Sequence, residues 1–402
     1  MRMTRILGTW DRRVALQRWN GTFNWGALQA EGTNSFLDVH FADISGGQTR
    51  IYHDATALLE DTYFHDFHQQ GTTSLENQPL ILTQHAGPCT VRRCHLNQYY
   101  ETLWRYGVNT IEDTLFENMN GDALDFDVGR PGSVIRRCTF AHGAVFNVDA
   151  IDLGNEGSLG TEEVLIEDNH IFDFPFDKGM SIGENSFNTV VRNCLIHHVS
   201  KGIQVKDICT VCIYNCTITE AEIGLHGYEK FAGTGAGRIT NSYNNILWGN
   251  TNAIVYDPLK SIVVVNYTDT GGTNWPTGAG NINTDPLFVN PAAWDWRLQP
   301  GSPCIGTGSN GATMGVTFPV GVFVQAPTDL AAAGGSSAVS LSWLDNSPSE
   351  AVFLIERSSD GAPFAGLAHV PLNTTNYVDA EVLAGHTYRY RVRGANIMTN
   401  SA

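Results

Sequence analysis

Long apolar runs are absent from this sequence. No stretch approaches the roughly 20 apolar residues that a membrane-spanning helix needs, and residues 1–10 contain no apolar segment of the secretory type. We therefore expect no insertion into a membrane. If the protein is extracellular, its secretion signal must lie outside this chain.

Basic residues are also scarce. The 402 residues include 24 Lys and Arg against 41 Asp and Glu, which gives a formal charge of −17. No segment gathers the basic residues into a patch, and a chain of this charge repels nucleic acid. Nucleic acid is therefore excluded as the expected partner.

Paired cysteine motifs are rare as well. The eight cysteines are mostly scattered, and Cys209 and Cys212 form the one Cys-x-x-Cys pair, with no second pair and no pair of histidines nearby. Structural zinc sites need four such ligands. We therefore interpret the cysteines as buried thiols that fill the interior.

The chain does contain a short repeat, in which a β-branched residue is followed by two polar residues, a small residue and then apolar residues. Each copy has the length of a strand, and none has a helical period. Such repeats predict a solenoid of strands. The clear copies are residues 91–96, 111–116, 135–140, 166–171, 191–196 and 213–218, and weaker copies are 37–41 and 59–64.

One position of this repeat holds small or polar side chains in successive copies. In a solenoid these side chains would stack about 4.8 Å apart. We expect this ladder to be internal and structural. Its members are Cys94, Thr114, Cys138, Asn169, Cys194 and Cys216.

A second repeated strand alternates with the first. Its copies begin at Asp122, Asp149, Lys178 and Lys201, with a looser copy at Ile223, and the four clear copies start 23 to 29 residues apart. That spacing suits one coil of the solenoid per repeat.

The two strand repeats, their Asn or Cys ladder and their Gly, Asp and Asn corners resemble the right-handed parallel β-helix of pectate-lyase-type and polygalacturonase-type proteins. Residues 283–291 and 296–304 are similar to the ending that follows many bacterial extracellular β-helices. The resemblance implies an all-β fold, with a β-helix over residues 1–320, in an extracellular protein that acts on a polysaccharide. Lyases, hydrolases, epimerases, adhesins and binding proteins share this scaffold, so the fold alone does not settle the activity.

The composition changes after residue 325. Residues 338–343, 353–357 and 387–393 alternate with period two, which is typical of a β-sandwich. The proline, tryptophan and tyrosine positions in this stretch resemble a fibronectin type III domain over residues 326–402. Because such a domain still needs its last strand at residues 396–402, we expect it to be incomplete. The residues that carry the resemblance are Pro327, Leu330, Trp343, Tyr377, Tyr388 and Tyr390.

Apolar residues of the second repeat must point into the coil, so their neighbours must point outward. Stacking the copies predicts two outward columns. One holds Asp125, Asp152, Ser181, Gln204 and Gly224, and the other holds Asp127, Gly154, Gly183, Lys206 and His226, with Glu184 and Asp207 at the strand ends.

Carboxylates on adjacent coils, about 4.8 Å apart, repel one another until a cation or a proton relieves them. Oxygen ligands suit Ca²⁺ better than Zn²⁺. The expected calcium ligands are Asp125, Asp127, Asp152 and either Asn155 or Glu184. The resemblance then implies a calcium-assisted lyase on a uronic-acid polymer, in which a lysine removes the C5 proton, and Lys206 is the candidate base beside Asp125 and Asp152.

If a proton is shared instead, two aspartates become the acid and base of a glycoside hydrolase of the polygalacturonase type. The Gly-His-Gly and Arg-Ile-Lys motifs of that family are absent. A third hypothesis is a non-catalytic β-helix that binds glycan at a cell surface or holds other domains apart.

Four side chains are expected to bind the substrate. Trp104 and Tyr106 would offer flat rings to a sugar in one register, whereas the opposite register turns both rings inward and Arg105 outward beside Asp125. Gln204 and His226 are the outward polar candidates. The expected partner is an acidic polysaccharide, and the protein is expected to be a monomer.

Overall fold

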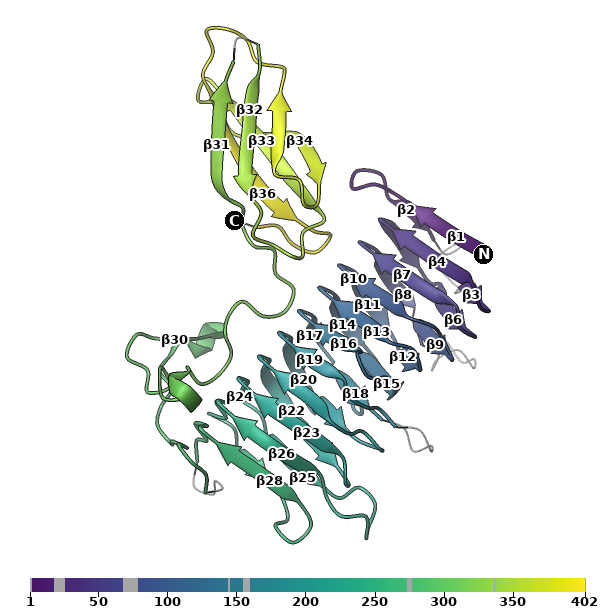
Figure 1. Ribbon diagram of the computed structural model, residues 1–402, viewed down its shortest axis with the longest axis vertical. Helices are drawn as coiled ribbons and strands as arrows, with labels where there is room; N and C mark the ends of the chain where they lie inside the picture. Colours follow the sequence, from purple (N-terminus) through teal and green to yellow (C-terminus); the bar gives the residue numbers. More distant parts are fainter. Residues whose placement is uncertain are drawn as a thin grey trace.

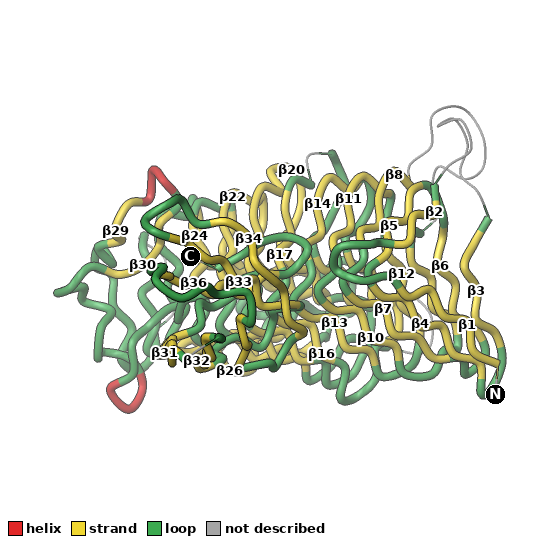
Figure 2. Tube along the Cα trace, turned by 90° about the horizontal axis from the view of Figure 1, so that it is seen from above, coloured by secondary structure: helices red, strands yellow, loops and turns green. Residues whose placement is uncertain are grey.

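The computed structural model describes most of the chain, as a solenoid of short parallel strands followed by a small sandwich of antiparallel strands (Figures 1 and 2). The described residues are 2–17, 26–67, 79–143, 145–154, 160–272, 277–335 and 337–401. Among these residues, no helix has the length and apolar character that crossing a membrane would require.

Most coils of the solenoid contribute one strand to each of three parallel faces, and the coils that begin with β26 and β28 lack a strand on the second face. The first face is an 11-stranded sheet. Its strands are β1 (Arg2–Leu7), β4 (Ser35–His40), β7 (Thr56–Glu60), β10 (Cys89–Arg92), β13 (Asn109–Glu112), β16 (Val134–Arg136), β19 (Leu165–Glu167), β21 (Thr189–Arg192), β23 (Thr210–Tyr214), β26 (Arg238–Tyr243) and β28 (Ile262–Asn266).

The second and third faces join into one 17-stranded sheet because β20 and β22 continue around the corner between them. The second face contains β2 (Val14–Leu16), β5 (Ala42–Ser45), β8 (Tyr63–Phe67), β11 (His95–Tyr99), β14 (Leu115–Met119), β17 (Thr139–Ala141), the first halves of β20 (His170–Ile182) and β22 (Leu195–Lys206), and β24 (Thr217–Thr219). The third contains β3 (Ala27–Glu31), β6 (Gln48–Tyr52), β9 (Ile81–Gln84), β12 (Thr102–Arg105), β15 (Leu124–Val128), β18 (Ile151–Leu153), the second halves of β20 and β22, β25 (Ile223–Tyr228) and β27 (Asn252–Val255).

Apolar residues alternate along each strand, and one set from every coil fills the interior. Leu124, Ile151 and Met180 are fully buried at paired positions of the third face. Phe116 and Phe140 stack on adjacent coils, with ring centroids 4.8 Å apart. Because the same alternation recurs in every coil, one continuous core runs the length of the solenoid.

The predicted ladder is confirmed at the corner between the first and second faces. Cys94, Cys138 and Asn169 are fully buried there. The Asn169 side chain accepts a hydrogen bond from the Cys138 backbone N–H at 2.8 Å and donates one to the Ile135 carbonyl at 3.0 Å. Asn therefore satisfies backbone groups that the corner leaves without strand partners.

The residue before each ladder position has a left-handed backbone, which turns the corner, and its side chain meets the neighbouring coil. Arg93 donates two hydrogen bonds to Asp61, at 2.9 and 2.8 Å, and Arg137 pairs with Asp113 in the same way at 2.8 and 2.7 Å. Opposite charges thus alternate from coil to coil along this corner.

After β28 the chain turns back over the solenoid. Residues 288–298 form a hairpin of β29 (Phe288–Asn290), a 3₁₀ turn η1 (Pro291–Ala293) and β30 (Asp295–Leu298), beside β24 in Figure 1. Residues 304–322, here called the strap, then run back toward the middle of the solenoid. The strap binds coil after coil through hydrogen bonds to Asp269, Asn244, Thr217, Asn193, Asp168 and Thr139.

The C-terminal part is a sandwich of two three-stranded antiparallel sheets. One holds β31 (Thr328–Gly334), β32 (Val339–Leu344) and β35 (Asn376–Asp379), and the other holds β34 (Ala365–Pro371), β33 (Val352–Ser359) and β36 (Tyr388–Ala395). Trp343 and Phe353 pack in its core, and the Tyr390 hydroxyl donates to Asp379 at 2.8 Å. The predicted sandwich is confirmed, while its likeness to fibronectin type III stays a prediction.

Candidate functional site

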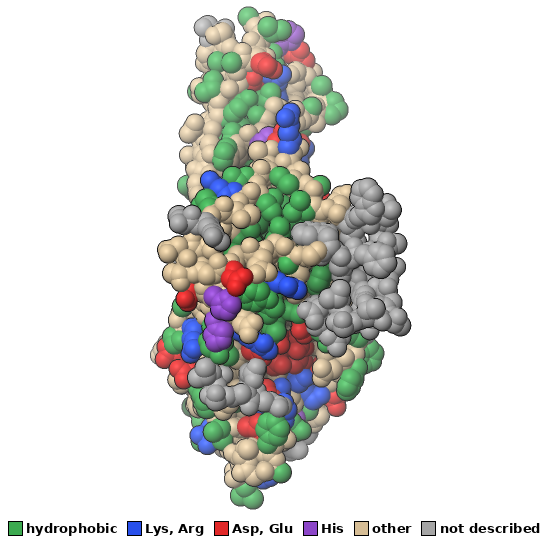
Figure 3. Space-filling model, turned by 90° about the vertical axis from the view of Figure 1, so that its right-hand side faces the viewer, with side chains coloured by type: hydrophobic (Ala, Val, Ile, Leu, Met, Phe, Trp, Pro, Cys, Tyr) green, Lys and Arg blue, Asp and Glu red, His purple; other side chains and the backbone are tan. Residues whose placement is uncertain are grey.

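The third face carries the predicted outward column. Asp125 pairs with Asp152, Asp152 with Ser181, Ser181 with Gln204, and Gln204 with His226. We call these five residues the site column. Figure 3 views the right-hand side of Figure 1, where acidic side chains gather in one patch flanked by basic ones.

The register of the last coil differs from the prediction. We expected Gly224 beside Gln204 and His226 beside Lys206, but His226 pairs with Gln204 and Tyr228 pairs with Lys206. The Gln204 side-chain nitrogen lies 2.7 Å from His226 Nδ1. Burial lowers the pKa of His226 to about 4, so its imidazole is neutral near pH 7 and Nδ1 can accept this hydrogen bond.

Most carboxylates near the site column have a basic partner. Asp127 pairs with Arg105, and Glu184 pairs with Lys230 and, at 3.7 Å, with Lys206. At the corner before the column, Asp149 accepts hydrogen bonds from Lys178 Nζ at 2.8 and 3.0 Å. The negative charges of these carboxylates are therefore neutralised by basic side chains of the protein itself.

Asp125 and Asp152 differ from these neighbours. Oδ1 of each is buried and has no hydrogen-bond partner among the described residues. Asp152 Oδ1 lies 3.8 Å from Lys206 Nζ, which is an ion pair without a hydrogen bond. The two carboxylates thus stack on adjacent coils with unsatisfied oxygens, and such oxygens are costly to bury.

Burial and mutual repulsion raise the pKa values of this group. Burial, followed by the charges of Asp127 and Asp152, raises the pKa of Asp125 to about 10. Burial is also the main cause that raises the pKa of Asp152, although Lys206 opposes it. The Asp125 carboxyl therefore holds a proton near neutral pH, while the Lys206 ammonium favours the ionised form of Asp152.

Sequence reasoning missed three further acids. Burial raises the pKa of Glu101 and of Asp149 to about 7, and that of Asp122 well above its ordinary value. The Asp149 backbone N–H donates to Asp122 Oδ1 at 2.7 Å, which links the two coils. A signal was present, because Asp-Ala-Leu-Asp at residues 122–125 recurs as Asp-Ala-Ile-Asp at residues 149–152.

A family model described as a right-handed β-helix region matches residues 79–266. This stretch includes the whole site column. The solenoid is a right-handed parallel β-helix. No curated protein matches the chain.

The Lys206 side chain reaches Asp152 by passing over Gly183. Its own coil is two coils beyond that of Asp152. The side chain crosses Gly183 so closely that a Cβ at Gly183 would lie 2.7 Å from Lys206 Cδ. Lys206 is not alone among the basic side chains that point outward here, because Arg105 also points outward and pairs with Asp127.

The two rings expected to stack on sugar are placed differently. Trp104 is 1% exposed and packs against Phe126 inside the β-helix, so it cannot meet a sugar, and this expectation was wrong. Tyr106 is half-buried at the corner of the coil. His85 from the coil before stacks on its ring, and the Arg130 guanidinium from the coil after lies 5.3 Å from its centre.

The four predicted calcium ligands do not form one compact cage. Asp125 and Asp152 offer unpaired oxygens, whereas Asp127 and Glu184 are held by basic side chains. Asn155 lies outside the described residues. A calcium ion would therefore bind mainly to Asp125 and Asp152, with further ligands from its substrate or from water.

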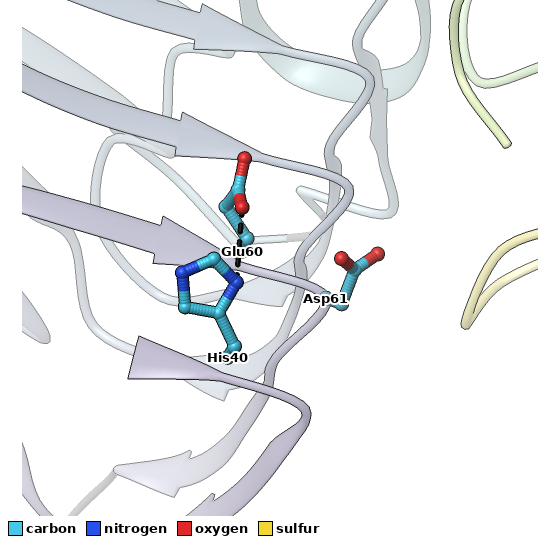
Figure 4. Close-up of side chains that lie close together, drawn as sticks. All are labelled: His40, Glu60 and Asp61. Atoms are coloured by element: carbon cyan, nitrogen blue, oxygen red, sulfur yellow. Dashed lines mark ion pairs between the residues drawn. The ribbon is translucent and has the colours of Figure 1, made fainter. Parts of the chain in front are cut away.

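Among the described residues, one set of three carboxylate and imidazole groups has all its ligand atoms within 4.8 Å of one another: His40, Glu60 and Asp61 (Figure 4). His40 Nδ1 lies 3.0 Å from Glu60. Arg93 binds both oxygens of Asp61, and Glu60 pairs with Arg92. We interpret this set as part of the row of alternating charges at the corner between the first and second faces, because its carboxylates already have basic partners.

Proposed function

We propose that this β-helix protein cleaves a polysaccharide on its third face, with Asp125 and Asp152 as the acid and base pair. The observation that carries the proposal is the stacking of these two carboxylates on adjacent coils, each with a buried oxygen that lacks a hydrogen bond. Acid and base roles separate when the surroundings push the pKa values of two carboxyl groups apart.

The surroundings of the two aspartates differ in the required direction. Asp125 has Asp122, Asp127 and Asp152 as charged neighbours, which favour its protonated form. Asp152 has the Lys206 ammonium at 3.8 Å, which favours its ionised form. Asp125 would donate a proton to the glycosidic oxygen, and Asp152 would act as the base or the nucleophile.

The wall beside this pair can receive a chain of sugars. Gly154 and Gly183 carry no side chains of their own next to Asp152 and Ser181, and the Lys206 side chain lies across Gly183. Gln204 and His226 continue the site column, two and three coils beyond Asp152, at about 4.8 Å per coil. A glycan lying along the β-helix axis could therefore hydrogen-bond to the half-buried His226 while its cleaved bond sits at the aspartates, and Gln204, which is 5% exposed, holds the His226 ring in place.

The experiment measures products from a panel of neutral and uronic-acid polysaccharides. We expect new reducing ends, and we expect Asp125→Asn and Asp152→Asn each to lower the rate by about 10²- to 10⁴-fold, the usual contribution of acid–base catalysis. Asp173→Asn, which changes an exposed carboxylate on the second face, is the matched control and should retain the rate. Equal activity of all three variants would refute the assignment.

A calcium-assisted lyase on a uronic-acid polymer is the second candidate, and the unpaired Oδ1 atoms of Asp125 and Asp152 favour it. Bound calcium would neutralise the sugar carboxylate, which makes the C5 proton more acidic. This activity would leave products with the ultraviolet absorbance of a conjugated double bond and would stop when a chelator is added. Binding of a polysaccharide without any product would support the non-catalytic alternative instead.

We also propose that the protein acts outside the cell, where such polymers occur.

A further inference from the structure

A cleft lies away from the third face of the β-helix. It opens between the end of β24 and the hairpin of β29 and β30, and its volume is about 450 Å³. Binding pockets for small molecules commonly span 300–1,000 Å³. The residues that define its chemistry are Glu220, Trp248, Asp285, Phe288, Trp296 and Gln299.

The walls of this cleft combine aromatic rings with hydrogen-bonding groups. Trp248 is half-buried and is the aromatic ring of the lining that a ligand can reach. It packs against Trp296 and Phe288, which are buried, 3% and 7% exposed, and meet edge to face at 5.2 Å. Trp296 Nε1 is buried without a hydrogen-bond partner in the described part of the chain. Glu220 and Asp285 supply carboxylates, and the described lining contains no Lys or Arg. An anionic ligand would be repelled here.

A chain of three histidines ends at one of these carboxylates. His170 Nε2 lies 2.9 Å from His197 Nε2, His197 Nδ1 lies 2.7 Å from His198 Nδ1, and His198 Nε2 lies 2.7 Å from Glu220 Oε2. Neutral imidazole has one donor and one acceptor nitrogen. If His198 Nε2 donates to Glu220, then His197 Nδ1 donates to His198 Nδ1 and His170 Nε2 donates to His197 Nε2, and every hydrogen bond in the chain has one donor and one acceptor.

The surroundings of His170 and His197 keep these two imidazoles neutral and fixed. Burial lowers the pKa of His170 to about 4 and that of His197 to about 2. His197 is fully buried, and Phe172, Trp294 and Trp296 pack around its ring. The Glu220 carboxylate is therefore held in one orientation at the cleft, as a hydrogen-bond acceptor.

We propose that this cleft is a second saccharide-binding site, which holds an uncharged sugar unit with Glu220 as its positioned acceptor. Sugar rings have an apolar C–H face that packs on aromatic rings and hydroxyl groups that donate to carboxylates, so they match both kinds of wall. The volume accommodates a small oligosaccharide. The site is separate from the third-face column and does not depend on its proposed activity.

The test is calorimetric titration with neutral cello-, xylo-, malto- and manno-oligosaccharides, and with oligogalacturonate as the anionic comparison. The protein carries Asp125→Asn and Asp152→Asn, so that no ligand is consumed at the third face. We expect one of the neutral series to bind. Glu220→Gln and Trp248→Ala should each weaken that binding by about tenfold or more.

Two matched variants separate binding from folding. Glu222→Gln changes an exposed carboxylate that hydrogen-bonds to Ser200 and lies outside the cleft, and it should leave the affinity unchanged. Trp248→Phe keeps an aromatic ring and should restore most of the affinity that Trp248→Ala loses. The proposal is overturned if no neutral oligosaccharide binds, if oligogalacturonate binds more tightly than the neutral series, or if Glu220→Gln and Trp248→Ala both bind normally.

Discussion

Replacing Asp125 with Asn removes a carboxyl group that must bind a proton when the protein folds near neutral pH. The pKa of Asp125 is raised from 3.8 to about 10 in the folded protein, mainly by burial. Between these two values the unfolded chain has released the proton and the folded protein still holds it. The free energy of unfolding therefore falls by about 1.4 kcal/mol for each pH unit above 3.8, which amounts to up to about 4 kcal/mol at pH 7.

Asn has nearly the same shape and needs no proton, so Asp125→Asn should make the protein more stable at pH 7 by up to this amount while it lowers the rate of cleavage. The gain should shrink to nothing as the pH falls toward 4, because both states of the parent then hold the proton. Urea unfolding of parent and variant at pH 4.5, 6, 7 and 8 measures this difference. Other titrating acids, such as Glu101 and Asp149, contribute to both proteins and largely cancel.

Asp127→Asn is the matched control because it makes the same change two residues along the strand. Asp127 pairs with Arg105 and is mostly buried, so its loss leaves a guanidinium without its partner and should destabilise the protein at pH 7. Our account of Asp125 fails if Asp125→Asn is less stable than the parent at pH 7, or if the difference between them does not vary with pH.

Two further predictions concern side chains that cross between coils. Gly183→Ala should displace the Lys206 ammonium from Asp152, because the new Cβ would lie 2.7 Å from Lys206 Cδ. We expect the cleavage rate to fall while the midpoint of thermal unfolding changes little. An unchanged rate would show that Lys206 has no part in the reaction. Arg93→Met should lower the free energy of unfolding, measured in urea, by about 3–5 kcal/mol, because it leaves the buried Asp61 without its two hydrogen bonds. A loss below about 1 kcal/mol would show that the alternating charges at this corner contribute little to stability.

The sequence was sufficient to predict the β-helix and most of the site column. Alternation with period two fixes which side chains point outward, and the repeated Asp-Ala-x-Asp strands bring Asp125 and Asp152 to paired positions. The shift at the last coil was avoidable. Ile203 and Leu225 both point inward and pair, so aligning them places His226 beside Gln204.

Other features could not be predicted from the alternation. Leu103 and Trp104 are both apolar, so either of two registers buries one of them; packing of Trp104 against Phe126 in the next coil decides between the two. The histidine chain depends on residues from β20, β22 and the end of β24, and on Trp294 and Trp296 from a hairpin about 100 residues later. Neither a repeat nor a motif joins these segments in the sequence.

The strap determines where the sandwich leaves the β-helix. Its last hydrogen bond to the solenoid, from the Val322 backbone N–H to Thr139 at 2.9 Å, lies in the coil of β16 and β17, near the middle of the solenoid. The sandwich is therefore attached near the middle of the β-helix rather than at its end. A force applied to the sandwich would act first on the strap hydrogen bond at Thr139 and then on each following contact in turn. The strap would therefore detach from the β-helix one coil at a time.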